Sequence, residues 1–224
     1  MRSADAESFD AVYRGGGVFS LPPWDIGEPQ PEFVRLMEAG EIKGRVLDAG
    51  CGTGSLALYL AKRGLDVVAL DFSPTAVQLG RRKAAGRQLP VVFEVSDLSA
   101  VGGHEAEFDT LLDCALLHAL EEPERGRYMR ELWRMARPGG IAHVLTFSDE
   151  LPDFVEVVKG VGPHRATGEE LLREMAEAGW RVRSLERSTI IGQIAVKEMA
   201  RALEAEVTTR IELPAWLAMA QRPW

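Results

Sequence analysis

One short stretch, residues 46–54, constrains the fold of this chain more strongly than any other. It contains three glycines, Gly50, Gly52 and Gly54, and begins inside the apolar run of residues 45–49. Glycines at such a junction let the backbone turn tightly and approach a ligand closely. Leucine and alanine then recur at helical spacing over residues 56–61. The stretch is therefore predicted to be a loop that joins a strand to a helix.

Strand-like and helix-like patterns alternate along the rest of the chain. Further strands are predicted at residues 66–71, 91–95, 108–113, 141–147, 180–191 and 215–221. The predicted fold is therefore α/β, with a doubly wound, mostly parallel, seven-stranded Rossmann-like sheet and helices on both faces. Ligands of such sheets bind beyond the carboxyl ends of the strands, so we expect the site there.

Several helix boundaries carry signals of their own. Ser73 before Pro74 is a cap followed by proline at the first helical position. Thr167 and Glu170 form the pattern of a capping box. Residues 137–140, Arg-Pro-Gly-Gly, are expected to end a helix, and residues 196–205 are expected to form one.

An acidic residue, Asp71, ends the second predicted strand, 21 positions after Gly50. A carboxylate at that place accepts hydrogen bonds from both hydroxyls of a ribose. Glycines alone indicate only a tight turn. Glycines combined with this acid favour a nucleoside cofactor.

The spacing of the glycines distinguishes between two nucleoside cofactors. Dinucleotide loops read G-x-G-x-x-G and bring a helix N-terminus to the pyrophosphate, whereas this loop reads G-x-G-x-G after Asp48. A carboxylate at Asp48 repels pyrophosphate but suits the ammonium of a methionine-like group, directly or through water. The pattern favours S-adenosylmethionine, and an NAD-dependent oxidoreductase is the alternative from another class.

Composition excludes several other classes of protein. Lys plus Arg is 26 and Asp plus Glu is 34, so the net charge is −8 and nucleic acid is not an expected partner. Two cysteines, Cys51 and Cys114, are too few for a disulfide framework or a zinc site, so no metal is expected. No apolar run is long enough for a membrane span or a signal core, which predicts a cytoplasmic protein without membrane contact.

Residues 1–31 differ from the rest of the chain in texture. They combine glycine and proline with Phe9, Tyr13, Phe19 and Trp24. Aromatic side chains favour burial, so we expect a short helix and a loop that fold over the site as a lid. Ordinary packing against the main body is the alternative. Residues 32–224 would then form the catalytic domain, as a monomer or a homodimer.

Five segments together make the chain resemble the class I S-adenosylmethionine-dependent methyltransferases: residues 46–54, 71–73, 96–98, 108–118 and 137–140. The resemblance implies that Asp97 holds the adenine amino group, Leu98 the ring edge, and that Phe72 packs on adenine or ribose. The expected cofactor-binding residues are Trp24, Asp48, Gly50, Cys51, Gly52, Asp71, Phe72, Asp97, Leu98 and Asp113.

Residues 23–31 and 113–118 are similar to small-molecule methyltransferases of actinobacterial type, among them the heterocyclic toxin methyltransferases. Thiopurine and thiol methyltransferases are more distant relatives. That resemblance implies a small aromatic or heterocyclic acceptor, and a Trp24 that lines the methionine end of the cofactor. Cys114 departs from the serine of the narrower pattern. The Asp-Pro-Pro type of motif found in nucleic-acid methyltransferases is absent from this segment.

Methyl transfer is an in-line displacement that needs alignment and, for a hydroxyl acceptor, a base. His118 follows the fourth predicted strand and is the candidate base or orienting group. Tyr13, Phe19 and Phe147 are candidates for an aromatic acceptor pocket. Methylation at a hydroxyl oxygen is favoured, with nitrogen or sulfur as alternatives, and a non-catalytic cofactor-binding protein remains a third possibility.

The other histidines have simpler expectations. His143 is predicted to lie in a strand core and His104 in solvent. His164 lies in a loop that either borders the pocket or has no part in it.

Overall fold

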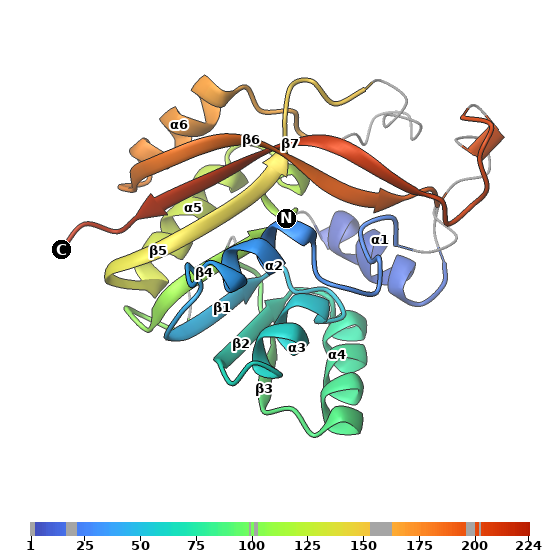
Figure 1. Cartoon of the computed structure of the whole chain (residues 1–224), viewed down its shortest axis with the longest axis horizontal. Coiled ribbons are helices and arrows are strands. Elements are labelled where there is room, and N and C mark those ends of the chain that lie inside the picture. The colour runs from blue at the N-terminus through green and yellow to red at the C-terminus, as the bar shows by residue number, and fades with distance from the viewer. Residues whose placement is uncertain are drawn as a thin grey trace.

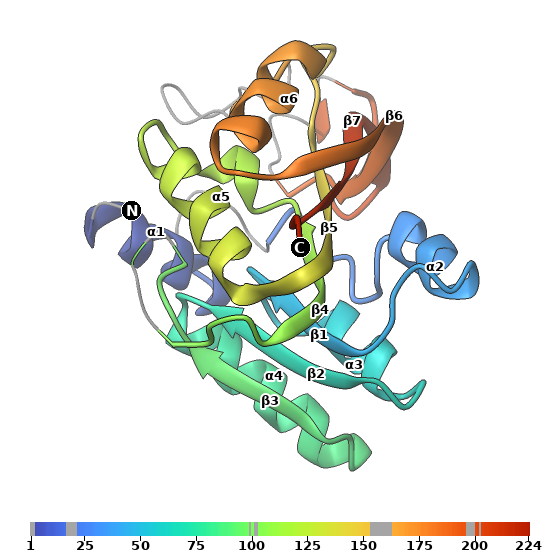
Figure 2. The same ribbon diagram turned by 90° about the vertical axis from the view of Figure 1, so that its left-hand side faces the viewer.

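A computed structural model describes residues 3–16, 22–98, 100, 103–152, 163–195, 200–201 and 203–224. Its centre is one seven-stranded sheet with the order β3-β2-β1-β4-β5-β7-β6 (Figures 1 and 2). The strands are β1 (Arg45–Ala49), β2 (Asp66–Asp71), β3 (Val91–Val95), β4 (Phe108–Cys114), β5 (Ala136–Phe147), β6 (Arg181–Gln193) and β7 (Arg210–Gln221). The pairs among β1 to β5 are parallel, and β7 runs antiparallel to β5 and β6. The predicted fold class is confirmed.

Helices cover both faces of the sheet, as Figure 2 shows. The helices are α1 (Ser3–Tyr13), α2 (Pro31–Glu38), α3 (Ser55–Ala61), α4 (Pro74–Arg87), α5 (Glu124–Met135) and α6 (Gly168–Glu177), with a 3₁₀ turn, η1 (Leu117–Ala119). One core cluster joins α5 and α6 to the sheet, and a second joins α2, α3 and α4 to it. Because both faces are covered, the central strands β1, β2 and β4 are buried along most of their length instead of alternating between buried and exposed residues.

The helix caps follow the sequence signals. Ser73 Oγ accepts a hydrogen bond from the amide of Ala76 at 3.0 Å, and Thr167 Oγ1 accepts one from the amide of Glu170 at 3.1 Å. A capping box would also return the Glu170 side chain to the backbone amide of Thr167. Here the Glu170 carboxylate instead contacts Arg125 and His164.

Two expectations about boundaries need correction. Residues 137–140 belong to β5 rather than to the end of a helix, and β7 begins at Arg210. β5 begins early because Ala136 pairs with Phe108 of β4. β7 begins early because its antiparallel ladder with β6 pairs residues from Arg181 with Gln221 to Gln193 with Arg210. The helix expected over residues 196–205 lies mostly outside the described residues.

A search of the described residues for a helix that is long and apolar enough to cross a bilayer finds none.

Candidate active site

The carboxyl ends of β1, β2 and β4 meet at one edge of the sheet. The register places Ala49 of β1 beside Leu70 of β2 and Asp113 of β4. The loops that follow these strands therefore carry the predicted site residues into one region, as expected for a parallel sheet.

The glycine loop after β1 needs its glycines for two reasons. Gly50 and Gly52 adopt positive φ angles of 71° and 53°, which favour glycine. A Cβ on Gly50 would also lie 2.9 Å from the Leu116 side chain, and one on Gly52 would lie 2.9 Å from Tyr13 Oη. The loop thus makes close backbone contacts on the side that faces the site.

Asp71, at the end of β2, braces this loop. Its Oδ2 accepts from the amide of Gly52 and its Oδ1 from the amide of Ser73, both at 2.8 Å. Burial raises the pKa of this carboxyl. Each carboxylate oxygen has a second lone pair, so Asp71 retains capacity to accept from ribose hydroxyls.

A first cavity, of about 300 Å³, opens in front of Asp71. Its lining combines carboxylates with apolar side chains, as an adenosine requires: Gly50, Asp71, Phe72, Ser96, Asp97, Leu98, Leu116 and Leu120. It brings together five of the residues predicted to bind the cofactor, and Leu116 and Leu120 are additions from the loop after β4.

A second cavity, of about 580 Å³, shares Gly50 with the first. Its lining includes the predicted residues Tyr13, Trp24, Asp48, Gly50, Cys51 and Gly52, together with Cys114 and Ala115 after β4. Among the described residues that line it are three carboxylates, Asp25, Glu28 and Asp48, and no lysine or arginine. This electrostatic character suits a cationic group.

Aromatic residues of the N-terminal segment lie beside the second cavity, and Tyr13 and Trp24 line it. Trp24 Nε1 donates to Tyr13 Oη at 2.8 Å, and the ring of Phe9 lies 5.5 Å from that of Trp24 and 5.9 Å from that of Phe72, between ring centroids. Phe19 lies outside the described residues.

Two acidic side chains fasten the segment to the predicted cofactor loops. Asp10 accepts from Ser73 Oγ at 2.5 Å and from the amide of Thr75 at 3.0 Å, at the start of α4. Asp25 Oδ2 accepts from Thr53 Oγ1 of the glycine loop at 2.6 Å. Sequence reasoning missed both residues, because nothing in the local pattern indicates a partner so distant along the chain.

The far end of the β6–β7 hairpin holds the same segment from the other side (Figure 1). Gln193 Nε2 donates to the carbonyls of Pro22 and Asp25, each at 2.8 Å. Gln30 exchanges two hydrogen bonds of 2.8 Å with the backbone of Ile191. The long antiparallel strands therefore hold in place the N-terminal segment, which contributes Tyr13 and Trp24 to the second cavity.

Asp113 lines neither of the two cavities. Its carboxylate accepts from the amides of Leu116 and Leu117 at 2.8 and 3.1 Å and from Tyr128 Oη at 2.9 Å. Burial raises its pKa to about 7. These contacts make Asp113 the support of the turn η1 rather than a wall of the cofactor cavities.

His118 lies on η1, and its ring stacks on Phe147 with the centroids 4.1 Å apart and the planes 20° apart. Its Nδ1 is buried and has no hydrogen-bond partner among the described residues. Burial, and secondarily the nearby His164, lowers the pKa of His118 to about 3, so the ring is neutral. Neither His118 nor Phe147 lines the two cavities, although Leu116 and Leu120 of the same connection do.

For His143 the predicted position is confirmed, and for His104 it needs correction. His143 is buried in β5, as expected, with 1% of its surface exposed. His104 was expected in solvent, but its ring contacts Glu107 at 2.6 Å and Glu94 at 3.2 Å. No group of three or more side chains suited to a metal ion occurs within the described part of the chain.

Comparison with known proteins identifies the family of this chain. A family model described as a methyltransferase domain matches residues 46–140. A Mycobacteroides abscessus protein named 2-heptyl-1-hydroxyquinolin-4(1H)-one methyltransferase is 41% identical over 181 residues, which are 79% of this chain and 77% of that protein. The chain belongs to the S-adenosylmethionine-dependent methyltransferases.

Solved structures agree with the fold of this methyltransferase. One solved structure is described as the conversion of a disulfide bond into a thioacetal group during echinomycin biosynthesis. It superposes on this chain with a TM-score of 0.86 at 39% identity, and the match covers 98% of this chain and 93% of the other chain. A Burkholderia thailandensis methyltransferase, solved with 1,6-didemethyltoxoflavin and S-adenosylhomocysteine, has a TM-score of 0.62 at 21% identity, and covers 87% of this chain and 77% of its own. The second likeness concerns the fold alone.

Asp48 leads to a prediction about how this methyltransferase binds its cofactor. The carboxylate is 1% exposed, accepts from the amide of Ala57 at 3.0 Å, and has a pKa raised by burial to about 7. A bound ammonium stabilises the ionised form. The affinity for S-adenosylhomocysteine should therefore fall as the pH drops below about 7, by up to about tenfold per pH unit.

Titration calorimetry between about pH 5.5 and 8.5 measures this slope. Asp48→Asn keeps an acceptor for the amide of Ala57 but removes the charge, so the variant should bind more weakly at high pH and show a flatter profile. A variant that keeps the full slope would assign the proton to another group.

Proposed function

We propose that this enzyme transfers a methyl group from S-adenosylmethionine to the hydroxyl oxygen of a small, planar, aromatic heterocycle. The observation that carries the proposal is the extended identity to the Mycobacteroides abscessus enzyme, whose name gives it an acceptor with a hydroxyl on a ring nitrogen. Membership of the methyltransferase family sets aside the NAD-dependent oxidoreductase that the sequence left open.

The residues of the two cavities fit the cofactor. Asp71 would hold the ribose and Asp97 and Leu98 the adenine, with Phe72 packed beside them. Asp48 and the carboxylates of the second cavity would face the positive methionine end, next to Trp24 and the backbone of the glycine loop. The positive φ of Gly50 and Gly52 and the short distances that a Cβ would meet there support a loop shaped for close contact.

When bound, S-adenosylmethionine supplies an electrophilic methyl carbon on a sulfonium, and transfer yields a methyl ether, S-adenosylhomocysteine and the proton of the acceptor hydroxyl. The chain must align the acceptor oxygen with that carbon and exclude water. We assign the exclusion of water to a lid of residues 1–31, since Asp10 and Asp25 dock it on the cofactor loops. Residues 32–224 form the catalytic domain.

His118 would receive the proton or orient the hydroxyl. Its neutral ring can accept a hydrogen bond at Nδ1, the atom that lacks a partner in the described structure. The burial that keeps the ring neutral also opposes the imidazolium form, so His118 is a weak base. The site therefore favours acceptors whose hydroxyl is itself acidic, such as a phenol or a hydroxyl on a ring nitrogen. Tyr13 and Phe147 would flank such a planar acceptor.

A methyl-transfer assay tests the proposal directly. The enzyme is given S-adenosylmethionine with a deuterated methyl group and one of three probes: 2-heptyl-1-hydroxyquinolin-4(1H)-one, its analogue without the 1-hydroxyl, and an aromatic thiol. Mass spectrometry should find the label on the first probe alone, as an ether. Label on the ring nitrogen of the second probe, or on the thiol, would replace oxygen with the nitrogen or sulfur alternative.

A further inference from the structure

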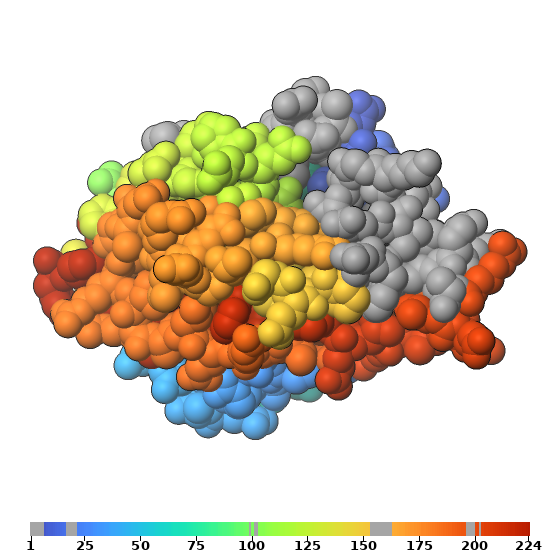
Figure 3. All heavy atoms as spheres, turned by 90° about the horizontal axis from the view of Figure 1, so that it is seen from above, coloured from blue at the N-terminus to red at the C-terminus, as the bar shows by residue number. Residues whose placement is uncertain are grey.

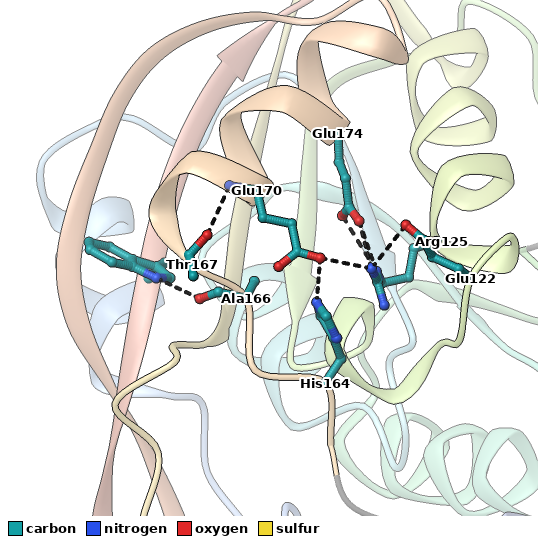
Figure 4. Close-up of polar contacts among 8 residues, drawn as sticks. Glu122, Arg125, His164, Ala166, Thr167, Glu170 and Glu174 are labelled. Carbon is teal, nitrogen blue, oxygen red and sulfur yellow. Dashed lines mark hydrogen bonds and ion pairs between the residues drawn. The ribbon is translucent and has the colours of Figure 1, made fainter.

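A buried guanidinium joins α5 to α6 (Figure 4). Arg125 of α5 is 4% exposed, and its Nη2 donates to Glu174 Oε1 at 2.7 Å and to Glu170 Oε1 at 3.2 Å, both on α6. Its Nε donates to Glu174 as well, at 3.1 Å, and Glu122 lies 3.5 Å from Nη2. The guanidinium is thus fixed by several carboxylates at once.

Holding two helices together with this cluster carries a large desolvation penalty. Burying a guanidinium and the carboxylates against it costs desolvation that the ion pairs repay only in part, and apolar side chains of similar size often replace such groups without loss of stability. In Figure 3, α5 and α6 lie side by side over a broad face, and apolar residues of both already share one core. The cluster also fixes the Glu170 carboxylate, which lies against His164.

His164 connects the cluster to the active-site turn. Its backbone amide donates to the carbonyl of His118 at 2.7 Å. Its ring Nε2 lies 3.0 Å from Glu170 Oε1, a close contact that is not aligned as a hydrogen bond. Figure 4 shows Glu170 between the two, with its carboxylate toward both His164 and Arg125.

The turn that carries His118 is thus fixed from two directions. From within its own connection, the Asp113 carboxylate holds the amides of Leu116 and Leu117. From outside it, His164 holds the carbonyl of His118 itself, and the Phe147 ring supports the imidazole from one side. A shift of residue 164 would move the His118 backbone and turn its ring against Phe147.

We propose that His164 is a positioning residue for His118, held in place by the Glu170 and Arg125 cluster. The role of His118 in methyl transfer is taken from the proposed function, but the mechanical link from Glu170 to His118 does not depend on it. A displacement of a catalytic group by about 1 Å can cost a transfer reaction about a hundredfold in rate. Loosening the contact between Glu170 and His164 should therefore lower kcat and leave the affinity for the cofactor intact.

Histidine NMR tests the link without any acceptor. The Cε1–H signals of the four histidines are assigned by single substitutions, and then recorded in Glu170→Gln and, separately, His164→Asn. Glu170→Gln should shift the signals of His164 and His118 and leave those of His104 and His143 in place, and His164→Asn should shift that of His118. The matched control is Glu107→Gln, which alters a similar contact with His104 near the amino end of β4. A His118 signal that is unchanged in both site variants overturns the proposal.

A double-mutant cycle supplies the kinetic readout, with 2-heptyl-1-hydroxyquinolin-4(1H)-one as the acceptor. Glu170→Gln should lower kcat about tenfold, as contacting residues couple, with the Kd of S-adenosylhomocysteine within about twofold of wild type. In a His118→Ala background the same change should cost nothing further. An equal loss in both backgrounds would make the cluster purely structural and refute the link. Full activity of His118→Ala would instead refute the proposed role of His118, and the NMR result would still decide the link.

Discussion

Replacing Asp71 with alanine should weaken the binding of S-adenosylhomocysteine by at least about a hundredfold. In the proposed cofactor pose two ribose hydroxyls lose the carboxylate that accepts from them, and the loop that this carboxylate braces through the amides of Gly52 and Ser73, each 2.8 Å away, loses that support. Each ribose hydroxyl left without an acceptor on binding costs about 1–3 kcal/mol, and each 1.4 kcal/mol corresponds to about tenfold in affinity. The variant should bind poorly at any pH.

Calorimetric titration of the purified variant measures this loss. Asp66→Ala is the matched control, because Asp66 begins the same strand at the opposite edge of the sheet and its side chain is 58% exposed. Asp71→Asn keeps the size of the side chain and should bind at an intermediate level. Unchanged affinity in Asp71→Ala, with the control intact, would remove Asp71 from the cofactor site.

The gathering of the glycine loop and Asp71 at one end of the sheet could be predicted because its signals are local. Gly50, Gly52 and Asp71 lie at strand ends, and parallel pairing of β1 with β2 brings strand ends together whatever the rest of the chain does. The first cavity accordingly unites Gly50, Asp71, Phe72, Asp97 and Leu98.

The parts that were missed depend on contacts between distant segments. Nothing near Asp10 in the sequence indicates Ser73, and nothing near Arg125 indicates Glu174, because each pair forms only when separate helices dock. The length of β6 and β7 is likewise a property of their mutual ladder. Asp113 shows the same limit. Its position near the end of β4 is visible in the sequence, but the Leu116 amide and the Tyr128 hydroxyl that bond to its carboxylate are not.

Removing the His118 ring should reduce methyl transfer to a hydroxyl acceptor by about a hundredfold in kcat, within the range of a lost proton acceptor. The affinity for S-adenosylhomocysteine should stay within about twofold, because His118 lines neither cavity and Asp71 is untouched. His118→Ala opens space beside Phe147, so His118→Phe is the sharper variant. It keeps a ring against Phe147 and removes both nitrogens.

The size of the loss should depend on the acidity of the acceptor hydroxyl. An acidic hydroxyl ionises without a proton acceptor and needs His118 little, whereas a less acidic hydroxyl depends on a group that takes its proton as the methyl group is transferred. Across hydroxyquinolines that differ only in a remote substituent, the ratio of wild-type to His118→Phe kcat should rise as the hydroxyl becomes less acidic. A ratio that is constant across the series would mean that His118 orients the acceptor without taking its proton, and a ratio of one throughout would place the reacting oxygen elsewhere.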